Sequence, residues 1–388
     1  MFKRIKIGLL PRIILAISLG VVCSLFFPNW MVRIFSTING IFGNFLSFSI
    51  PLIILGLVAP GIADLGSSAG RLLGITAALA YFSTLFAGFM SFFVADTLFP
   101  YMLNVGEHMN DALIGGDAPQ FTPYFTKDMP PLMSVVGSLL IAFILGLGLA
   151  HVKNDSFRNV LNDFSKVVSG LISSIIIPLL PLFIFGIFLK MGAEGAVAGI
   201  MTVFVKVLAL VIVMQIALLI IQYTVAGAIS GKNPFKALKT MLTAYVTALG
   251  TQSSAATIPV TLEQTKKNGV KPELAGFVIP LCATIHLGGS TMMITTCSMA
   301  VMVMSGMPYT FAMYVGFIMM LGVTMVAAPG VPGGAIMAAI GILQSMLGFD
   351  ETMQALMIAL YITMDSFGTA CNVTGDGAIA LIVNKFTK

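Results

Sequence analysis

The feature that most constrains this chain is a succession of long apolar runs. A membrane-spanning helix needs about 20 apolar residues, and such runs cover residues 8–27, 41–63, 72–99, 133–152, 167–191 and 195–229. Of the 388 residues, 58% are hydrophobic and only 9% are charged, which leaves too little polar surface for a water-soluble protein of this size. We therefore expect an all-α polytopic membrane protein. A soluble domain, a disordered chain and a nucleic-acid-binding protein are excluded.

The apolar pattern changes after residue 230. Glycine, proline, serine and threonine interrupt the stretches at 234–266 and 308–347. Irregular backbone at membrane depth must be buried in protein or line a wet cavity, because lipid cannot pair its N–H and C=O groups. Paired interrupted segments are typical of secondary transporters built from inverted repeats. We predict eight transmembrane helices and two re-entrant helical hairpins, with the solute site in the C-terminal part.

Basic residues predict the orientation of the chain, since cytoplasmic loops are enriched in lysine and arginine. With this topology, 16 of them lie on one side, and only Arg33, Lys127 and Lys190 lie on the other. Both termini are therefore predicted to be cytoplasmic.

Two carboxylates, Asp365 and Asp376, fall well inside a predicted span. With Thr369 and Asn372 they follow steps of four, three and four residues, so all four share one helix face. An acid at membrane depth is costly and is expected to face a cavity and bind a cation or a polar substrate. The alternative is a polar seam that only holds helices together.

Two further segments carry polar candidates. His286, Gly288 and Gly289 interrupt the preceding span, where freed carbonyls would suit Na⁺ and the imidazole would suit a proton. The imidazole could equally be a neutral side chain bonded to backbone. Ser253 and Ser254 lie where a hairpin would turn, so that free N–H groups of a starting helix could hold a carboxylate; a plain serine-rich turn is the alternative.

Four motifs occur in order in the last 150 residues. They are Ser-Ser-Ala-Ala-Thr-Ile-Pro at 253–259, Pro-Leu-Cys-Ala-Thr-Ile-His-Leu-Gly-Gly-Ser at 280–290, Gly-Val-Pro-Gly at 330–333, and Asp-x-x-x-Thr-x-x-Asn-Val-Thr-Gly-Asp at 365–376. Together they resemble the dicarboxylate/amino acid:cation symporters, the glutamate and neutral amino acid transporter family. The resemblance implies a homotrimer of elevator-type transporters in the plasma membrane. It implies a scaffold of residues 1–70 and 100–194, and a moving transport domain of residues 71–99 and 195–388.

The resemblance also implies roles for individual residues. The substrate would contact both hairpin tips, the broken span and the last span, at Gln252, Ser253, Ser254, Ser290, Val331, Gly333, Asp365, Gly368, Thr369 and Asn372. Na⁺ would be bound, partly by backbone carbonyls, at Cys282, Thr284, His286, Leu287, Met325, Val326, Ala328, Asn372 and Asp376.

Departures from the family pattern refine the expected substrate and ions. Members that carry acidic substrates have an arginine where this chain has Gly368, so no guanidinium is available for a side-chain carboxylate. A small neutral amino acid is expected, as in the serine/threonine branch. Oxygen ligands of the deepest Na⁺ site are replaced by Leu85, His286 and Gly288, and an aspartate before Asp365 is replaced by Tyr361. We predict that this third Na⁺ site is missing.

The sequence thus predicts a Na⁺-coupled symporter of small neutral amino acids, without an organic cofactor. Coupling to H⁺ through His286 and Asp376, Na⁺-independent transport, and a passive channel or anion conductance are the alternatives. An enzyme is not expected, because the chain has no His-Glu-x-x-His motif and no serine nucleophile elbow.

Overall fold

The computed structural model describes residues 9–67, 71–103, 121–151, 155–195, 197–326, 328 and 332–386. Over these residues the chain forms helices and connecting loops, and no strand. The helices are α1 (Leu9–Ser24), α2 (Asn29–Ser67), α3 (Arg71–Met102), α5 (Val135–His151), α6 (Asp155–Leu171), the π-helical turn η1 (Ile172–Ile176), α7 (Ile177–Ala193), α8 (Val197–Ser230), α9 (Pro234–Thr251), α10 (Ser254–Lys267), α11 (Pro272–Ile285), α12 (Gly288–Met304), α13 (Phe311–Val326), α14 (Gly334–Leu347) and α15 (Glu351–Phe386).

Six helical stretches in the described part are long and apolar enough to cross a membrane. They are Asn29–Pro60, Leu72–Met102, Ser156–Ala193, Ile200–Ser230, Pro272–Met304 and Glu351–Phe386. Four shorter apolar helices accompany them, Pro11–Ser24, Leu140–Leu149, Phe311–Val326 and Gly334–Leu347. The prediction of an all-helical integral membrane protein is confirmed, whereas the number of eight spans stays a prediction.

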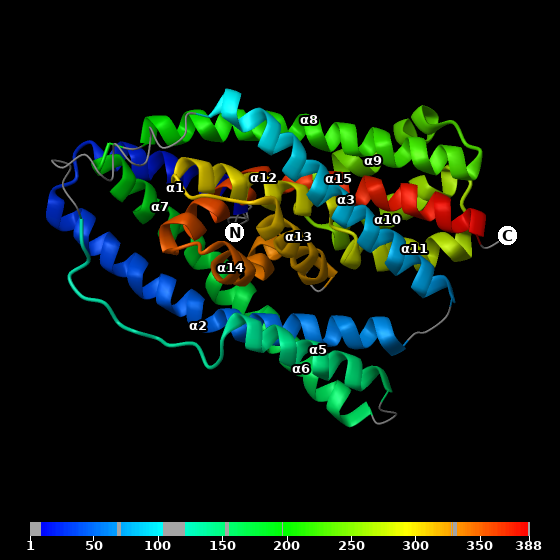
Figure 1. The fold of residues 1–388 in the computed structure, drawn as a ribbon, viewed down its shortest axis with the longest axis horizontal. Helices are drawn as coiled ribbons and strands as arrows, with labels where there is room; N and C mark the ends of the chain where they lie inside the picture. The colour runs from blue at the N-terminus through cyan, green and yellow to red at the C-terminus, as the bar shows by residue number, and fades with distance from the viewer. Residues whose placement is uncertain are drawn as a thin grey trace, which may run out of the picture.

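The helices pack in two groups. In the first, α2 packs against α5, α6 and α7, and α1 packs against α7. In the second, α15 packs against α8, α9, α10, α11 and α12, while α3 packs against α12 and α13. Figure 1 shows α2, α5 and α6 along one side of the molecule, with α8, α15 and α3 on the other. The groups also contact each other, since α13 and α14 pack against α2, and α1 and α7 pack against α15. The division into a scaffold and a transport domain stays a prediction.

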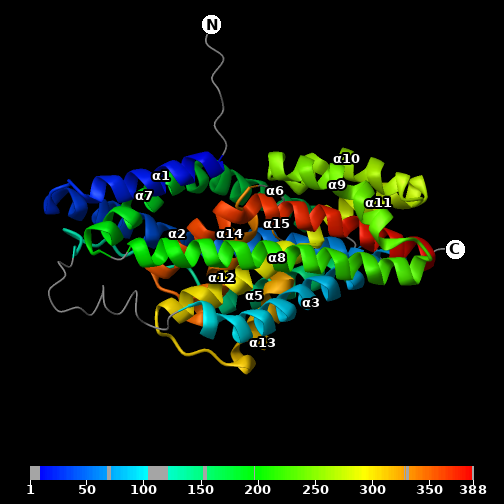
Figure 2. The ribbon, with the colours of Figure 1, turned by 90° about the horizontal axis from the view of Figure 1, so that it is seen from above.

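Two helix pairs occupy the predicted hairpins. Helices α9 and α10 pack together and lie near the end of the molecule that holds the C-terminus (Figure 2). Their turn has local causes: Gln252 ends α9 in the left-handed conformation, with φ 53°, and Ser253 caps α10 by accepting a hydrogen bond from the Ala256 N–H. Helices α13 and α14 form the second pair, and of the tip between them only Ala328, Pro332 and Gly333 are described. That either pair re-enters the membrane is untested.

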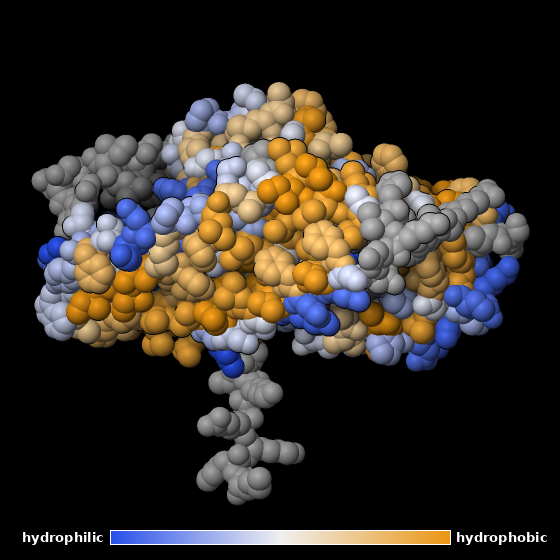
Figure 3. Space-filling model, turned by 90° about the horizontal axis from the view of Figure 1, so that it is seen from below, coloured by the Kyte–Doolittle hydropathy of each residue, from blue (hydrophilic) through white to orange (hydrophobic). Residues whose placement is uncertain are grey.

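The surface agrees with a lipid environment. In Figure 3, apolar residues cover much of the visible face, and hydrophilic residues gather toward both ends of the long axis, with a further group near the middle. Large side chains such as Phe82, Ile144, Val205 and Val213 are more than half exposed, which water would penalise and hydrocarbon would not. The polar groups in the middle of α15, by contrast, lie inside the protein, whereas Glu351 and Lys385 near its ends are exposed.

Candidate functional site

The four polar residues predicted to share one face lie on a single uninterrupted helix, α15. Asp365, Thr369, Asn372 and Asp376 are 5, 6, 3 and 1% exposed. Helices α8, α9, α10, α11 and α12 all pack against α15. The polar face therefore points into the protein, as the spacing predicted, and each of its groups needs a partner or a ligand.

Asn372 joins α15 to the start of α12. Its Oδ1 accepts hydrogen bonds from the N–H groups of Gly289, at 2.8 Å, and Ser290, at 3.3 Å. These belong to the first turn of α12, whose own N-cap residue, Leu287, makes no side-chain capping bond. Asn372 thus supplies from another helix the acceptor that a helix N-terminus requires.

Ser290 is the second point of contact between the two helices. Its Oγ accepts hydrogen bonds from Asn372 Nδ2, at 2.9 Å, and from the Tyr361 hydroxyl, at 3.0 Å. Tyr361 is 1% exposed. The tyrosine, which replaces a carboxylate expected from the family pattern, therefore serves as a hydrogen-bond donor inside the predicted substrate site.

Asp365 is bound by the tip of the second helix pair. The N–H of Gly333 donates a hydrogen bond of 2.7 Å to Asp365 Oδ2. Gly333 has φ 74° and caps α14, a conformation that L-residues other than glycine rarely adopt. The contact brings together two predicted substrate residues that are 32 positions apart in sequence.

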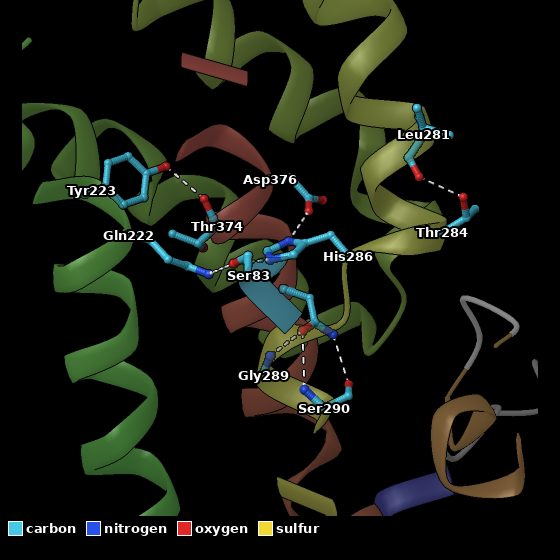
Figure 4. Close-up of polar contacts among 11 residues, drawn as sticks. Ser83, Gln222, Tyr223, Leu281, Thr284, His286, Gly289, Ser290, Thr374 and Asp376 are labelled. Atoms are coloured by element: carbon cyan, nitrogen blue, oxygen red, sulfur yellow. Dashed lines mark hydrogen bonds and ion pairs between the residues drawn. The ribbon is translucent and has the colours of Figure 1, made fainter. Parts of the chain in front are cut away.

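A second polar cluster surrounds the break between α11 and α12 (Figure 4). The helix ends at Ile285, and His286 and Leu287 form the break, immediately before the glycine pair that begins α12. His286 Nδ1 lies 2.9 Å from Asp376 Oδ1, and both side chains are 1% exposed. On the other side of the ring, His286 Nε2 lies 3.1 Å from Ser83 Oγ of α3, which also accepts a hydrogen bond of 2.9 Å from Gln222 Nε2 of α8.

These contacts orient the imidazole. When Asp376 is ionised its oxygens only accept hydrogen bonds, so Nδ1 is then the donor of this hydrogen bond. The Ser83 hydroxyl can donate to Nε2 in the neutral ring or accept from it in the charged ring, so the arrangement fits both forms. Asp376 Oδ2, among the described residues, is buried without a hydrogen-bond partner. One carboxylate oxygen thus remains available for a cation.

Other predicted Na⁺ ligands lie farther from this cluster or serve helix bonds. Thr284 is exposed, and its hydroxyl donates to the Leu281 carbonyl of its own helix, pointing away from His286 in Figure 4. The carbonyl oxygens of Cys282, Leu287 and Met325 accept hydrogen bonds from the N–H groups of His286, Thr291 and Ala328, respectively. Val326 ends α13. Whether any of these carbonyls also binds Na⁺ stays a prediction.

The positions of the remaining predicted substrate residues follow from the helices that carry them. Gln252 and Ser253 form the α9–α10 turn, and Ser254 begins α10, which packs against α15. Gly368 lies on α15 between Asp365 and Thr369, against Met293 of α12. Val331 lies outside the described residues.

Sequence reasoning missed the partners that come from elsewhere in the chain. Ser83, Gln222 and Met293 were not predicted, although a signal existed for one of them. Gln215 and Gln222 are two polar residues seven positions apart in the apolar helix α8, and therefore share a face. Gln215 Nε2 donates to the Gly289 carbonyl, at 3.4 Å, so both glutamines reach the region of the break.

Comparison with known proteins identifies the class to which this fold and site belong. The pattern of the sodium:dicarboxylate symporter family matches residues 9–386, and the chain belongs to that family. Its members are transporters, which agrees with the prediction that this chain is not an enzyme.

Individual relatives narrow the comparison. The chain is 27% identical to a serine/threonine transporter SstT of Acinetobacter baylyi, over 99% of this chain and 98% of the relative. It is 28% identical to the SstT of Acinetobacter baumannii strain AYE, over 96% of this chain and 95% of the relative. It is 25% identical to the SstT of Streptococcus thermophilus, over 98% of this chain and 96% of the relative. Both the family and these relatives support a membrane symporter for amino acids or dicarboxylates.

Proposed function

We propose that this protein is a Na⁺-coupled symporter of small neutral amino acids such as serine, threonine and alanine. The observation that carries the proposal is the enclosed polar face of α15, on which Asp365 and Asn372 are 5 and 3% exposed. In this proposal, Asp365 and Thr369 bind the α-ammonium group, while Asn372 and the α9–α10 turn bind the α-carboxylate.

The second hairpin tip supplies the gate in this proposal. Asp365 Oδ2 accepts from the Gly333 N–H at 2.7 Å, so the tip and a substrate ammonium group compete for the same carboxylate. Tip movement and substrate binding are therefore coupled. The small neutral substrate is supported by Gly368, which leaves no cationic side chain at that position of α15, and by the printed names of the relatives.

Uptake by purified protein in liposomes tests the proposal. We expect saturable uptake of radiolabelled serine under an inward Na⁺ gradient, and its loss in Asp365→Asn. Asp163→Asn is the matched control, because Asp163 is an exposed acid on α6 whose ion pair among the described residues is with Lys166. No serine, threonine or alanine uptake by the unaltered protein would refute the proposal, and current without saturable exchange would favour the passive channel or anion conductance.

Coupling to H⁺ is the second candidate, and the contact between His286 and Asp376 favours it. The imidazole Nδ1 lies 2.9 Å from one oxygen of the carboxylate that Na⁺ would need, so the two groups can share a proton. The same liposomes separate the candidates: a pH gradient without Na⁺ should drive uptake in the H⁺-coupled case only. His286→Asn, which restores an amide oxygen, should then shift the dependence toward Na⁺.

An elevator mechanism in a homotrimer completes the proposal. Support comes from the two packing groups, since α3 and α8–α15 would move as a unit past α1, α2, α5, α6 and α7. To test the motion, a pair of cysteines placed across the boundary between the two groups should form a cross-link that blocks uptake. To test the trimer, light scattering of the protein in detergent should give the mass of three chains. With cytoplasmic termini, a C-terminal tag should be protected from protease added outside intact cells.

A further inference from the structure

Met293 of α12 lies against Gly368, which belongs to the same stretch of α15 as the polar face. A Cβ atom added to Gly368 would collide with Met293 Sδ and would lie 3.4 Å from Met293 Cε and 3.6 Å from Ser290 Oγ. Gly368 is thus the residue that lets the methionine side chain of α12 lie directly against α15. The space that a side chain at position 368 would fill is filled from the opposite helix.

The surroundings of Met293 offer few polar groups to a substrate side chain at this point. Met293 is 0% exposed and Ser290 is 2% exposed. Ser290 Oγ already accepts two hydrogen bonds, from Tyr361 and Asn372. The wall next to Gly368 therefore consists of an unbranched thioether, which is apolar and adaptable in shape, and a hydroxyl whose acceptor sites are in use.

We infer that Met293 is a specificity-determining residue, whose thioether limits the size and polarity of the substrate side chain beside Gly368. The inference rests on the proposed function, because it assumes that the polar face between Asp365 and Asn372 holds the substrate. A short side chain ends before the thioether, whereas a longer one meets Met293. A side-chain carboxylate would lose most of its hydration against the thioether, with at most one hydroxyl donor, that of Ser290, in exchange.

A plain packing role for Met293 makes a different prediction. The whole of α12 is buried, and Met299, also 0% exposed, lies on the same helix six positions further along. If Met293 only fills the core, its truncation and that of Met299 should both lower stability without changing which substrates compete. A change in substrate preference that is confined to Met293 separates the two roles.

Competition in proteoliposomes provides the first test. Inhibition of serine uptake by alanine, threonine, methionine and leucine is measured for the unaltered protein, Met293→Ala and Met299→Ala. Truncating Met293 frees the space of three heavy atoms, and each extra methylene that becomes buried changes affinity by about fourfold. We expect methionine and leucine to inhibit Met293→Ala at least about tenfold more strongly relative to alanine, and Met299→Ala to keep the original ratio.

Gly368→Ala provides a second variant that is expected to fold, because alanine is the better helix former. Its methyl group should push the Met293 side chain toward the substrate, and inhibition of serine uptake by threonine should weaken more than inhibition by alanine. Adding Met293→Ala should restore the threonine to alanine ratio.

The outcomes separate this inference from the proposed function. Serine uptake with an unchanged competition profile in Met293→Ala, or no rescue of Gly368→Ala by the second substitution, would overturn the inference alone. Absence of neutral amino acid uptake by the unaltered protein would overturn the proposed function and this inference with it.

Discussion

Replacing Asn372 by alanine tests how the broken span is held together. In the structure this one side chain makes three hydrogen bonds to α12, two through Oδ1 and one through Nδ2. Asn372→Ala removes all of them and leaves the N–H groups of Gly289 and Ser290 buried without an acceptor. Water cannot replace the lost amide freely, because Asn372 is only 3% exposed.

The expected loss of stability follows from the two donors. Leaving a buried polar group without a partner costs about 1–3 kcal/mol, and loss of a helix N-cap acceptor costs about 1 kcal/mol. The two N–H groups share one acceptor, and the second bond is long, so the contributions are not additive. We expect Asn372→Ala to lower the unfolding free energy by about 2–4 kcal/mol.

Unfolding of the purified protein in mixed micelles, titrated with a denaturing detergent, measures this difference. Asn268→Ala is the matched control, because Asn268 Nδ2 makes a single 3.0 Å hydrogen bond to the Ala237 carbonyl at a partly buried helix end. It should lower the unfolding free energy by about 1 kcal/mol. Equal stability of Asn372→Ala and the unaltered protein would refute the role of Asn372 as the cap of α12.

Three further predictions concern packing, ion binding and accessibility. A Cβ at Gly20 would lie 2.7 Å from the backbone oxygen of Phe185 and 3.1 Å from the backbone nitrogen of Leu189, whereas one at Gly40 would meet nothing within 4 Å. Gly20→Ala should therefore lower the unfolding free energy in micelles by about 1 kcal/mol, while Gly40→Ala should leave it equal or higher; the same sign for both would contradict the contact. Thr284→Val should change the half-saturating Na⁺ concentration for uptake by less than about twofold, since its hydroxyl serves its own helix, and a larger change would show that the hydroxyl binds Na⁺. Cys23, which is partly exposed, should react with a maleimide before the buried cysteines, as mass spectrometry of the labelled peptides would report.

Much of the helical layout was predictable because membrane depth imposes length and periodicity. The apolar runs predicted α3 and α8 closely, and proline, glycine and serine marked both helix pairs. Some bounds differ: the run at 41–63 is the second half of α2, which begins at Asn29. The break predicted at His286, Gly288 and Gly289 comprises His286 and Leu287, and the two glycines begin α12. Turn and cap geometry decides such bounds, and hydropathy does not report it.

The sequence by itself determined that this chain is a helical membrane protein, and that Asp365, Thr369, Asn372 and Asp376 share one face of a helix. Both conclusions follow from local rules, since lipid demands apolar runs and a helix repeats every 3.6 residues. Only the tertiary structure decided the partners: Ser83 and Gln222 beside His286, Tyr361 on Ser290, and Met293 against Gly368. These contacts join helices as far as 203 residues apart in the chain, and the packing of those helices, which no local pattern encodes, brings the groups within hydrogen-bonding or van der Waals distance.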